Sequence, residues 1–131
     1  MANELILIIE DNEKNMKLVR DVLQFKGYRT VEAVSAEYGL MLARSQQPAL
    51  ILMDIQLPGM DGLTALRNLR ADPVLQRTPV IAITASAMTH DRQQILEAGF
   101  EGYLPKPINV KQFTEEVRKV LDARQSERVT S

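Results

Sequence analysis

Hydrophobic residues form short uninterrupted runs along the chain, and these runs alternate with longer segments of helical periodicity. Runs that are apolar at nearly every position are typical of parallel strands covered on both faces. Three runs have this character, and they are Leu5–Ile9, Leu50–Met53 and Val80–Thr84. Two weaker runs, Tyr28–Glu32 and Gly102–Leu104, complete a set of five predicted strands.

The segments between these runs carry helical signals. Met16, Val19 and Leu23 recur at helical spacing, and Gly27 follows as a residue type that commonly ends a helix. Three further helices are predicted after the capping residues Ser35, Asp61 and Asn109, and a fourth ends at Gly99. The chain becomes polar after Leu121, so we expect Asp122–Ser131 to fray.

The strand–helix order repeats five times, which indicates parallel strands joined by right-handed crossovers. Five units are too few for an eight-unit barrel, so the sequence favours an open, doubly wound sheet. We therefore expect an α/β protein of the flavodoxin-like (βα)5 type, with strand order 2-1-3-4-5 and helices on both faces. One domain would span residues 1–122, followed by a polar tail over residues 123–131.

Composition narrows the possible partners. The 131 residues include 16 basic and 17 acidic side chains, which argues against a surface that binds nucleic acids generally. The absence of cysteine excludes disulfides and thiolate metal sites. No apolar run approaches the roughly 20 residues of a membrane span, and the N-terminus is too short and acidic for a signal peptide. We expect a cytoplasmic domain that binds neither membranes nor nucleic acids.

Candidate chemistry lies where the predicted strands end. In open α/β sheets, ligands bind beyond the carboxyl ends of the strands. The residues found there are Glu10 and Asp11 after the first strand, Asp54 after the third, Thr84 at the end of the fourth and Lys106 after the fifth. The first and third strands are neighbours in the order 2-1-3-4-5, so Glu10, Asp11 and Asp54 should converge at one edge.

Three converging carboxylates repel one another unless a cation lies between them. With only oxygen donors and no histidine or thiolate nearby, Mg²⁺ is the ion that fits best. Lys106 adds a positive charge and Thr84 a hydroxyl donor. Together these groups describe a pocket for a phosphoryl group, in which Asp54 attacks phosphorus as a nucleophile.

Four segments in this order resemble the CheY-like response-regulator receiver family of two-component signalling. They are Glu10-Asp11, MDIQLPGMDG around Asp54, IAITASA around Thr84, and YLPKPI around Lys106. The spacing between these segments also matches, and the resemblance covers about residues 4–122. Taken singly, each residue has an ordinary structural explanation, and the joint pattern is what is specific.

The resemblance implies roles for the acidic residues. Asp54 would be the phosphoacceptor, and Glu10 and Asp11 would bind Mg²⁺ together with Asp54 and the backbone carbonyl of Gln56. Glu in place of a first Asp is a common variant of the acidic pair. The side chain of Gln56 and the residue Ser86 flank the site, where this family tunes the lifetime of the phosphoryl group.

The resemblance also implies roles at the last two strands. Thr84 would follow the phosphoryl oxygens, Lys106 would pair with them, and Tyr103 would be the aromatic residue that turns inward when Thr84 shifts. The Lys106–Pro107 peptide bond is expected to be cis.

The implied function is a signalling switch and not a metabolic enzyme. A histidine kinase or a phosphotransfer protein would phosphorylate Asp54, and the domain would catalyse only its own phosphorylation and slow dephosphorylation. Output would be protein contact through about residues 80–104, because only about ten polar residues follow Leu121. The segments IIEDNEKNMKLVRDVL, ILMDIQLPGMDGL and PVIAITASAM are similar to the single-domain DivK-type cell-cycle regulators. The chain could be a phosphorelay intermediate or an allosteric regulator of a kinase.

Two other classes use related features. A phosphatase of the haloacid-dehalogenase type also has an aspartyl nucleophile and Mg²⁺, but it carries a second Asp two residues later, where this chain has Gln56. A flavodoxin-like nucleotide or flavin binder needs a glycine-rich loop after the first strand, and here that loop is acidic.

Overall fold

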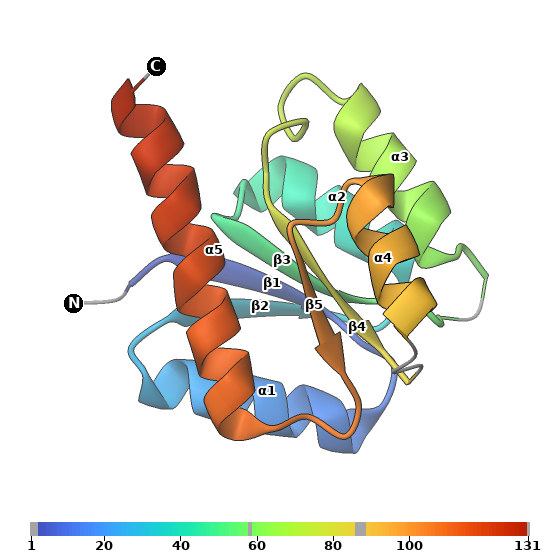
Figure 1. Ribbon diagram of the computed structural model, residues 1–131, viewed down its shortest axis with the longest axis vertical. Helices are drawn as coiled ribbons and strands as arrows, with labels where there is room; N and C mark the ends of the chain where they lie inside the picture. The colour runs from blue at the N-terminus through green and yellow to red at the C-terminus, as the bar shows by residue number, and fades with distance from the viewer. Residues whose placement is uncertain (1–2, 58, 86–88, 131) are drawn as a thin grey trace.

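A computed structural model of the protein describes residues 3–57, 59–85 and 89–130, with side chains described up to Ala85 and from Arg92 to Arg124. Strands and helices alternate strictly along the chain, as the sequence predicts (Figure 1). The strands are β1 (Leu5–Ile9), β2 (Arg29–Ala33), β3 (Leu50–Asp54), β4 (Val80–Thr84) and β5 (Gly102–Pro105). The helices are α1 (Glu13–Phe25), α2 (Ala36–Gln46), α3 (Gly62–Ala71), α4 (Thr89–Ala98) and α5 (Val110–Thr130).

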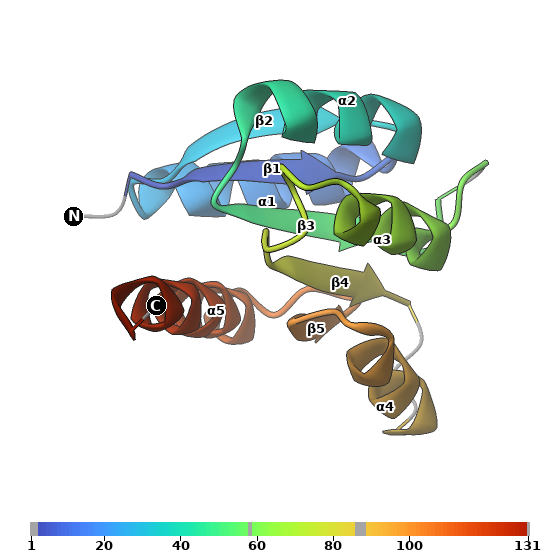
Figure 2. The same ribbon diagram turned by 90° about the horizontal axis from the view of Figure 1, so that it is seen from above.

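The five strands form one parallel sheet in the order β2-β1-β3-β4-β5, which confirms the predicted topology (Figure 2). β1 and β4 have the bounds read from the sequence, and β3 continues one residue further to Asp54. β2 begins one residue later than predicted because the backbone N–H of Tyr28 donates to Leu23 O and so belongs to the end of α1. The sheet therefore aligns the carboxyl ends of β1, β3, β4 and β5 along one edge.

Both faces of the sheet are covered by helices, which explains why its strands are apolar at nearly every position. One face packs against α2, α3 and α4, and the other packs against α1 and α5 (Figure 1). Successive residues of a strand alternate between these layers: Leu7 and Ile9 belong to the first cluster, whereas Ile6 and Ile8 belong to the second.

Short polar side chains cap the starts of three helices that follow strands. Ser35 and Asp61 accept the backbone N–H of Tyr38 and Thr64, as the predicted caps of α2 and α3 require. Asn109 accepts the N–H of Gln112 in the same way. Each cap satisfies a backbone N–H in the first turn of its helix and so fixes where that helix begins.

Helix α5 continues to Thr130, through the segment that the sequence predicted to fray. Val120 and Leu121 anchor this helix in the core, and the residues after them include neither Gly nor Pro to stop it. An ion pair between Arg118 and Asp122 bridges one turn at this point. The domain boundary at residue 122 stays a prediction. In the part of the chain that the structure describes, no helix is long and apolar enough to span a membrane.

Candidate functional site

The strand ends bring the predicted site residues to one edge of the sheet. β1, β3 and β4 are adjacent, and β5 lies next to β4. The residues at their carboxyl ends are Glu10 and Asp11 after β1, Asp54 as the last residue of β3, Thr84 as the last residue of β4, and Lys106 after β5. The sheet order thus converts positions spread over about a hundred residues of sequence into a single cluster.

Three carboxylates meet at this edge. Glu10, Asp11 and Asp54 each have a carboxylate oxygen within 4.8 Å of the others. Glu10 and Asp54 are almost fully buried, with 1% and 3% of their surface exposed, whereas Asp11 is open to solvent. Buried carboxylates at this separation require a compensating positive charge.

Lys106 supplies part of that charge. Its Nζ lies 2.6 Å from Asp54 Oδ2 and 3.3 Å from Glu10 Oε1. Burial lowers the pKa of Lys106, but the hydrogen bond to Asp54 and the negative charges of Asp54 and Glu10 outweigh burial and raise that pKa above its usual value. Lys106 is therefore a cation at neutral pH, held between two acids.

Glu10 is a buried acid whose charge is only partly compensated. Burial raises the pKa of Glu10, and the nearby charge of Asp54 adds to this effect, although the N–H of Asn12 and the ammonium of Lys106 act in the opposite direction. Glu10 Oε2 accepts the backbone N–H of Asn12 at 3.0 Å. Glu10 Oε1 is buried and receives no hydrogen bond from the described residues, although it forms an ion pair with Lys106.

This donor set fits a hard divalent cation. A buried carboxylate oxygen without a hydrogen-bond donor lies beside two further acids, one of them exposed to solvent, and all are oxygen ligands of the kind that Mg²⁺ prefers. Partial exposure of the cluster leaves room for the waters that Mg²⁺ retains. The part of the Gln56 backbone carbonyl in such a site stays a prediction.

Gln56 makes two contacts that sequence reasoning missed. Its backbone N–H donates to Asp54 Oδ1 at 2.8 Å, so both oxygens of Asp54 are engaged. Its side-chain Oε1 accepts the backbone N–H of Ala85 at 2.9 Å, directly after β4. The sequence does show a long amide side chain, Gln56, two residues after the strand-end Asp54. The direction in which that side chain points depends on the conformation of the turn, which the sequence pattern does not specify.

The turn after β3 closes on itself at Gly62. The Gly62 N–H donates to Ile55 O at 3.3 Å, and a Cβ built at Gly62 would lie 2.7 Å from Ile55 Cα. Only glycine allows the start of α3 to approach the end of β3 this closely. This closure fixes the backbone that carries Gln56 beside Asp54.

Two further predicted residues lie on β5 and after it. Tyr103 is half-buried, with Arg92 Cζ 6.0 Å from the centroid of its ring and its backbone N–H donating to Glu116 Oε2. The Lys106–Pro107 peptide bond is cis, the isomer that the resemblance implies. Ser86, named above as a flanking residue, lies outside the described residues.

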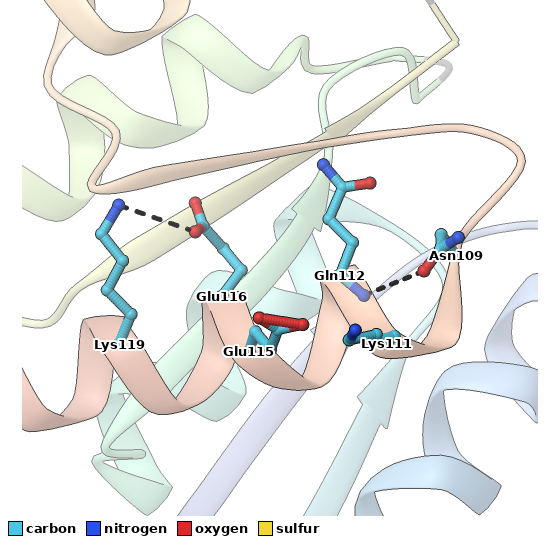
Figure 3. A pocket seen from close by; sticks show the side chains of 6 residues that line it. All are labelled: Asn109, Lys111, Gln112, Glu115, Glu116 and Lys119. Atoms are coloured by element: carbon cyan, nitrogen blue, oxygen red, sulfur yellow. Dashed lines mark hydrogen bonds and ion pairs between the residues drawn. The ribbon is translucent and has the colours of Figure 1, made fainter.

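A separate surface pocket lies along α5 and contains none of these site residues. It is lined by Asn109, Lys111, Gln112, Glu115, Glu116 and Lys119 (Figure 3). Within it, Lys119 pairs with Glu116 at 3.9 Å, and the backbone N–H of Gln112 donates to Oδ1 of the cap residue Asn109. None of the lining residues is one of the predicted site residues, so this pocket is separate from the acidic cluster at the strand ends.

Sequence comparison relates the chain to one family. The model of the response regulator receiver domain matches residues 6–118. The polar-differentiation response regulator DivK of Brucella ovis is 47% identical over 116 residues, which cover 88% of this chain and 94% of that protein. The DivK protein of Brucella anthropi is 46% identical over the same length.

Solved structures agree with this relationship. The receiver domain of a sensor histidine kinase from Pseudomonas aeruginosa, which has a magnesium ion coordinated in its active-site cleft, is 33% identical with a TM-score of 0.83. That similarity covers 92% of this chain and 98% of the other. A CheY-like receiver domain protein from Methanospirillum hungatei is 28% identical with a TM-score of 0.86, covering 95% of this chain and 98% of the other.

Proposed function

Because the chain belongs to the response regulator receiver domain family of two-component signalling, we propose that Asp54 accepts a phosphoryl group from a histidine kinase or a phosphotransfer protein. The observation that carries the proposal is the meeting of Glu10, Asp11 and Asp54 within 4.8 Å, with Lys106 Nζ 2.6 Å from Asp54. This arrangement combines a nucleophile, a cation-binding set of oxygens and a fixed ammonium at one rim.

In the proposed reaction, a carboxylate oxygen of Asp54 bonds to the phosphorus of the donor's phosphohistidine as the phosphorus–nitrogen bond breaks. The donor nitrogen keeps the electron pair and takes up a proton. The switch is reset by hydrolysis. Water attacks phosphorus and the bond from phosphorus to Asp54 breaks, which releases inorganic phosphate and restores the carboxylate. The protein thus catalyses only its own modification and its own slow reset.

Glu10, Asp11 and Asp54 would hold Mg²⁺ together with the backbone carbonyl of Gln56. When bound, the ion supplies positive charge that offsets the charge of the transferring group. Lys106 already lies against Asp54 Oδ2, so a small movement of its ammonium brings it to the phosphoryl oxygens. Thr84 ends the neighbouring strand and would donate its hydroxyl to the same oxygens.

Phosphorylation would change the surface formed by about residues 80–104. Thr84 lies at the rim, and Tyr103 lies on the adjacent strand β5, half-buried between the sheet and solvent. A shift of Thr84 toward the phosphoryl group would open space into which the Tyr103 ring turns. Protein partners would read this change as a shift between two states of the same surface.

The proposal places this switch in the cytoplasm, with output by protein contact and not by binding nucleic acids. Nearly balanced charge, 16 basic against 17 acidic residues, favours protein partners over a polyanion. Similarity to DivK favours a role close to histidine kinases, either as a relay intermediate or as a regulator of kinase activity. Onward transfer of the phosphoryl group from Asp54 to a phosphotransfer protein would indicate a relay intermediate, whereas a changed rate of kinase autophosphorylation without onward transfer would indicate a regulator.

The direct test is acetyl phosphate treatment followed by intact-mass analysis, with and without Mg²⁺. Wild type should gain one phosphoryl group only with the metal, Asp54→Asn should gain none, and the control Asp122→Asn should behave as wild type. Labelling that survives Asp54→Asn would overturn the assignment. Sustained turnover of p-nitrophenyl phosphate would favour a phosphatase instead of a switch.

A further inference from the structure

The side chain of Gln56 spans the mouth of the site, from the turn after β3 to the residue after β4. Its Oε1 accepts the Ala85 N–H at 2.9 Å, while its own backbone N–H holds Asp54 Oδ1 at 2.8 Å. One residue therefore contacts both the acceptor carboxylate and the first residue of the β4–α4 connection. Neither contact needs a phosphoryl group or a metal ion.

The Ala85 N–H belongs to the same peptide plane as the Thr84 carbonyl. That carbonyl accepts the backbone N–H of Lys106 at 2.8 Å. The Thr84–Ala85 peptide is thus held on two sides, by the backbone after β5 at one end and by the Gln56 side chain at the other. Because a peptide unit is planar, two bonds at its opposite ends fix its rotation.

The Gln56 contact also extends the pairing between β3 and β4. The Ile55 N–H donates to Ile83 O at 3.1 Å. Among the residues that the structure describes, this is the last backbone hydrogen bond between β3 and β4 toward their carboxyl ends. The bond from Ala85 to Gln56 adds one more connection beyond it, made by a side chain and not by the backbone. A side-chain connection can open by a rotamer change, whereas a backbone rung opens only if the strands separate.

We propose that the Gln56 side chain is a positioning residue that latches the Thr84–Ala85 peptide in its resting orientation and is released when Asp54 is phosphorylated. The inference rests on the proposed function, since it assumes that Thr84 moves toward a group on Asp54. Thr84 cannot advance with its peptide unchanged while both ends of that peptide are held. The latch therefore favours the resting state and slows entry into the phosphorylated one.

The test compares three variants of the full chain. Gln56→Met keeps the length of the side chain and removes the amide oxygen. Gln56→Glu keeps an oxygen that accepts the Ala85 N–H. Gln46→Met makes the same change at an exposed position on α2. The first measurement is amide hydrogen exchange in the unphosphorylated protein, which does not depend on the phosphorylation chemistry.

We expect Gln56→Met to speed exchange at Ala85 by about fivefold, the factor set by one hydrogen bond of ordinary net strength. The Ile55 amide, bonded to the backbone, should keep its exchange rate. Gln56→Glu should retain protection at Ala85, and Gln46→Met should match wild type. Unchanged exchange at Ala85 in Gln56→Met would overturn the latch, whatever happens at Asp54.

The second measurement is the rate of labelling by acetyl phosphate with Mg²⁺. Loss of the latch should raise this rate by about fivefold in Gln56→Met, because the competent state is then more populated. Faster exchange with an unchanged or slower labelling rate would reduce Gln56 to a structural contact and overturn the proposal. Failure of wild type itself to be labelled would count against the proposed function and leave the exchange result to stand alone.

Discussion

Lys106 Nζ lies 2.6 Å from Asp54 Oδ2, although 52 residues separate the two in the sequence. The pair joins the ends of β3 and β5 across the intervening strand β4. Glu10 lies 3.3 Å from the same ammonium, so a single cation compensates two nearly buried acids. The electrostatics of the resting site therefore depend on Lys106.

Replacing Lys106 with Met should destabilise the metal-free protein by about 2 kcal/mol, because Asp54 and Glu10 then lose their shared cation. This loss of stability is smaller than the roughly 3–5 kcal/mol expected when one partner of a fully buried ion pair is removed, because Lys106 is partly exposed. Urea unfolding at neutral pH with a chelator present measures it. Lys119→Met, at an exposed position, serves as the control. Equal effects of the two substitutions would contradict the role of Lys106.

Magnesium should stabilise the folded protein in proportion to the logarithm of its concentration once the site is saturated, by about 1.4 kcal/mol per tenfold increase. Glu10→Gln and Asp11→Asn should lose most of this increment, because each removes a negative oxygen ligand from the cluster. Glu13→Gln, at the exposed start of α1, should keep it. Thermal unfolding over a magnesium titration measures the effect, and equal increments in all variants would place the ion elsewhere.

The cap residue Asp61 should make stability depend on pH in the acid range. The Thr64 backbone N–H donates to its carboxylate and holds the pKa of Asp61 below its usual value. The folded protein therefore binds this proton at lower pH than the unfolded chain. The resulting stabilisation is complete above the usual pKa of about 3.9 and is lost as the pH falls through the folded value.

The matching substitutions are Asp61→Asn and Asp61→Ser, which retain a capping oxygen but do not titrate. The difference in unfolding free energy between about pH 6 and about pH 3 should be smaller in both variants than in wild type. Urea midpoints at the two pH values measure this difference. An identical pH dependence in wild type and both variants would show that the cap carboxylate does not contribute.

Replacing Gly62 with Ala should destabilise the protein by about 1–3 kcal/mol, although Ala is the better helix former. The added Cβ would lie 2.7 Å from Ile55 Cα, so the start of α3 must move away from the end of β3. Urea unfolding measures the cost. Leu63→Ala, at the next and exposed position, should change stability far less. Comparable effects at the two positions would contradict the close approach.

The architecture and the residues at the strand ends could be read from the sequence. Strands buried on both faces are apolar at nearly every position, and the alternation of strands and helices restricts the chain to a parallel sheet. Once the strand order is known, it follows that Glu10, Asp11 and Asp54 lie at the carboxyl ends of neighbouring strands. These are consequences of burial and connectivity, which leave a local trace in the order of residues.

Only the tertiary structure decided which side chains of the site contact one another. The side chain of Gln56 reaches Ala85, and Lys106 lies between Asp54 and Glu10, because rotamers and backbone turns from separate segments meet in one place. The start of β2 moved by one residue for the same kind of reason, since Tyr28 bonds back to α1. Periodicity reports which face of an element is buried, but the distance between two polar atoms depends on the packing of every element that carries them.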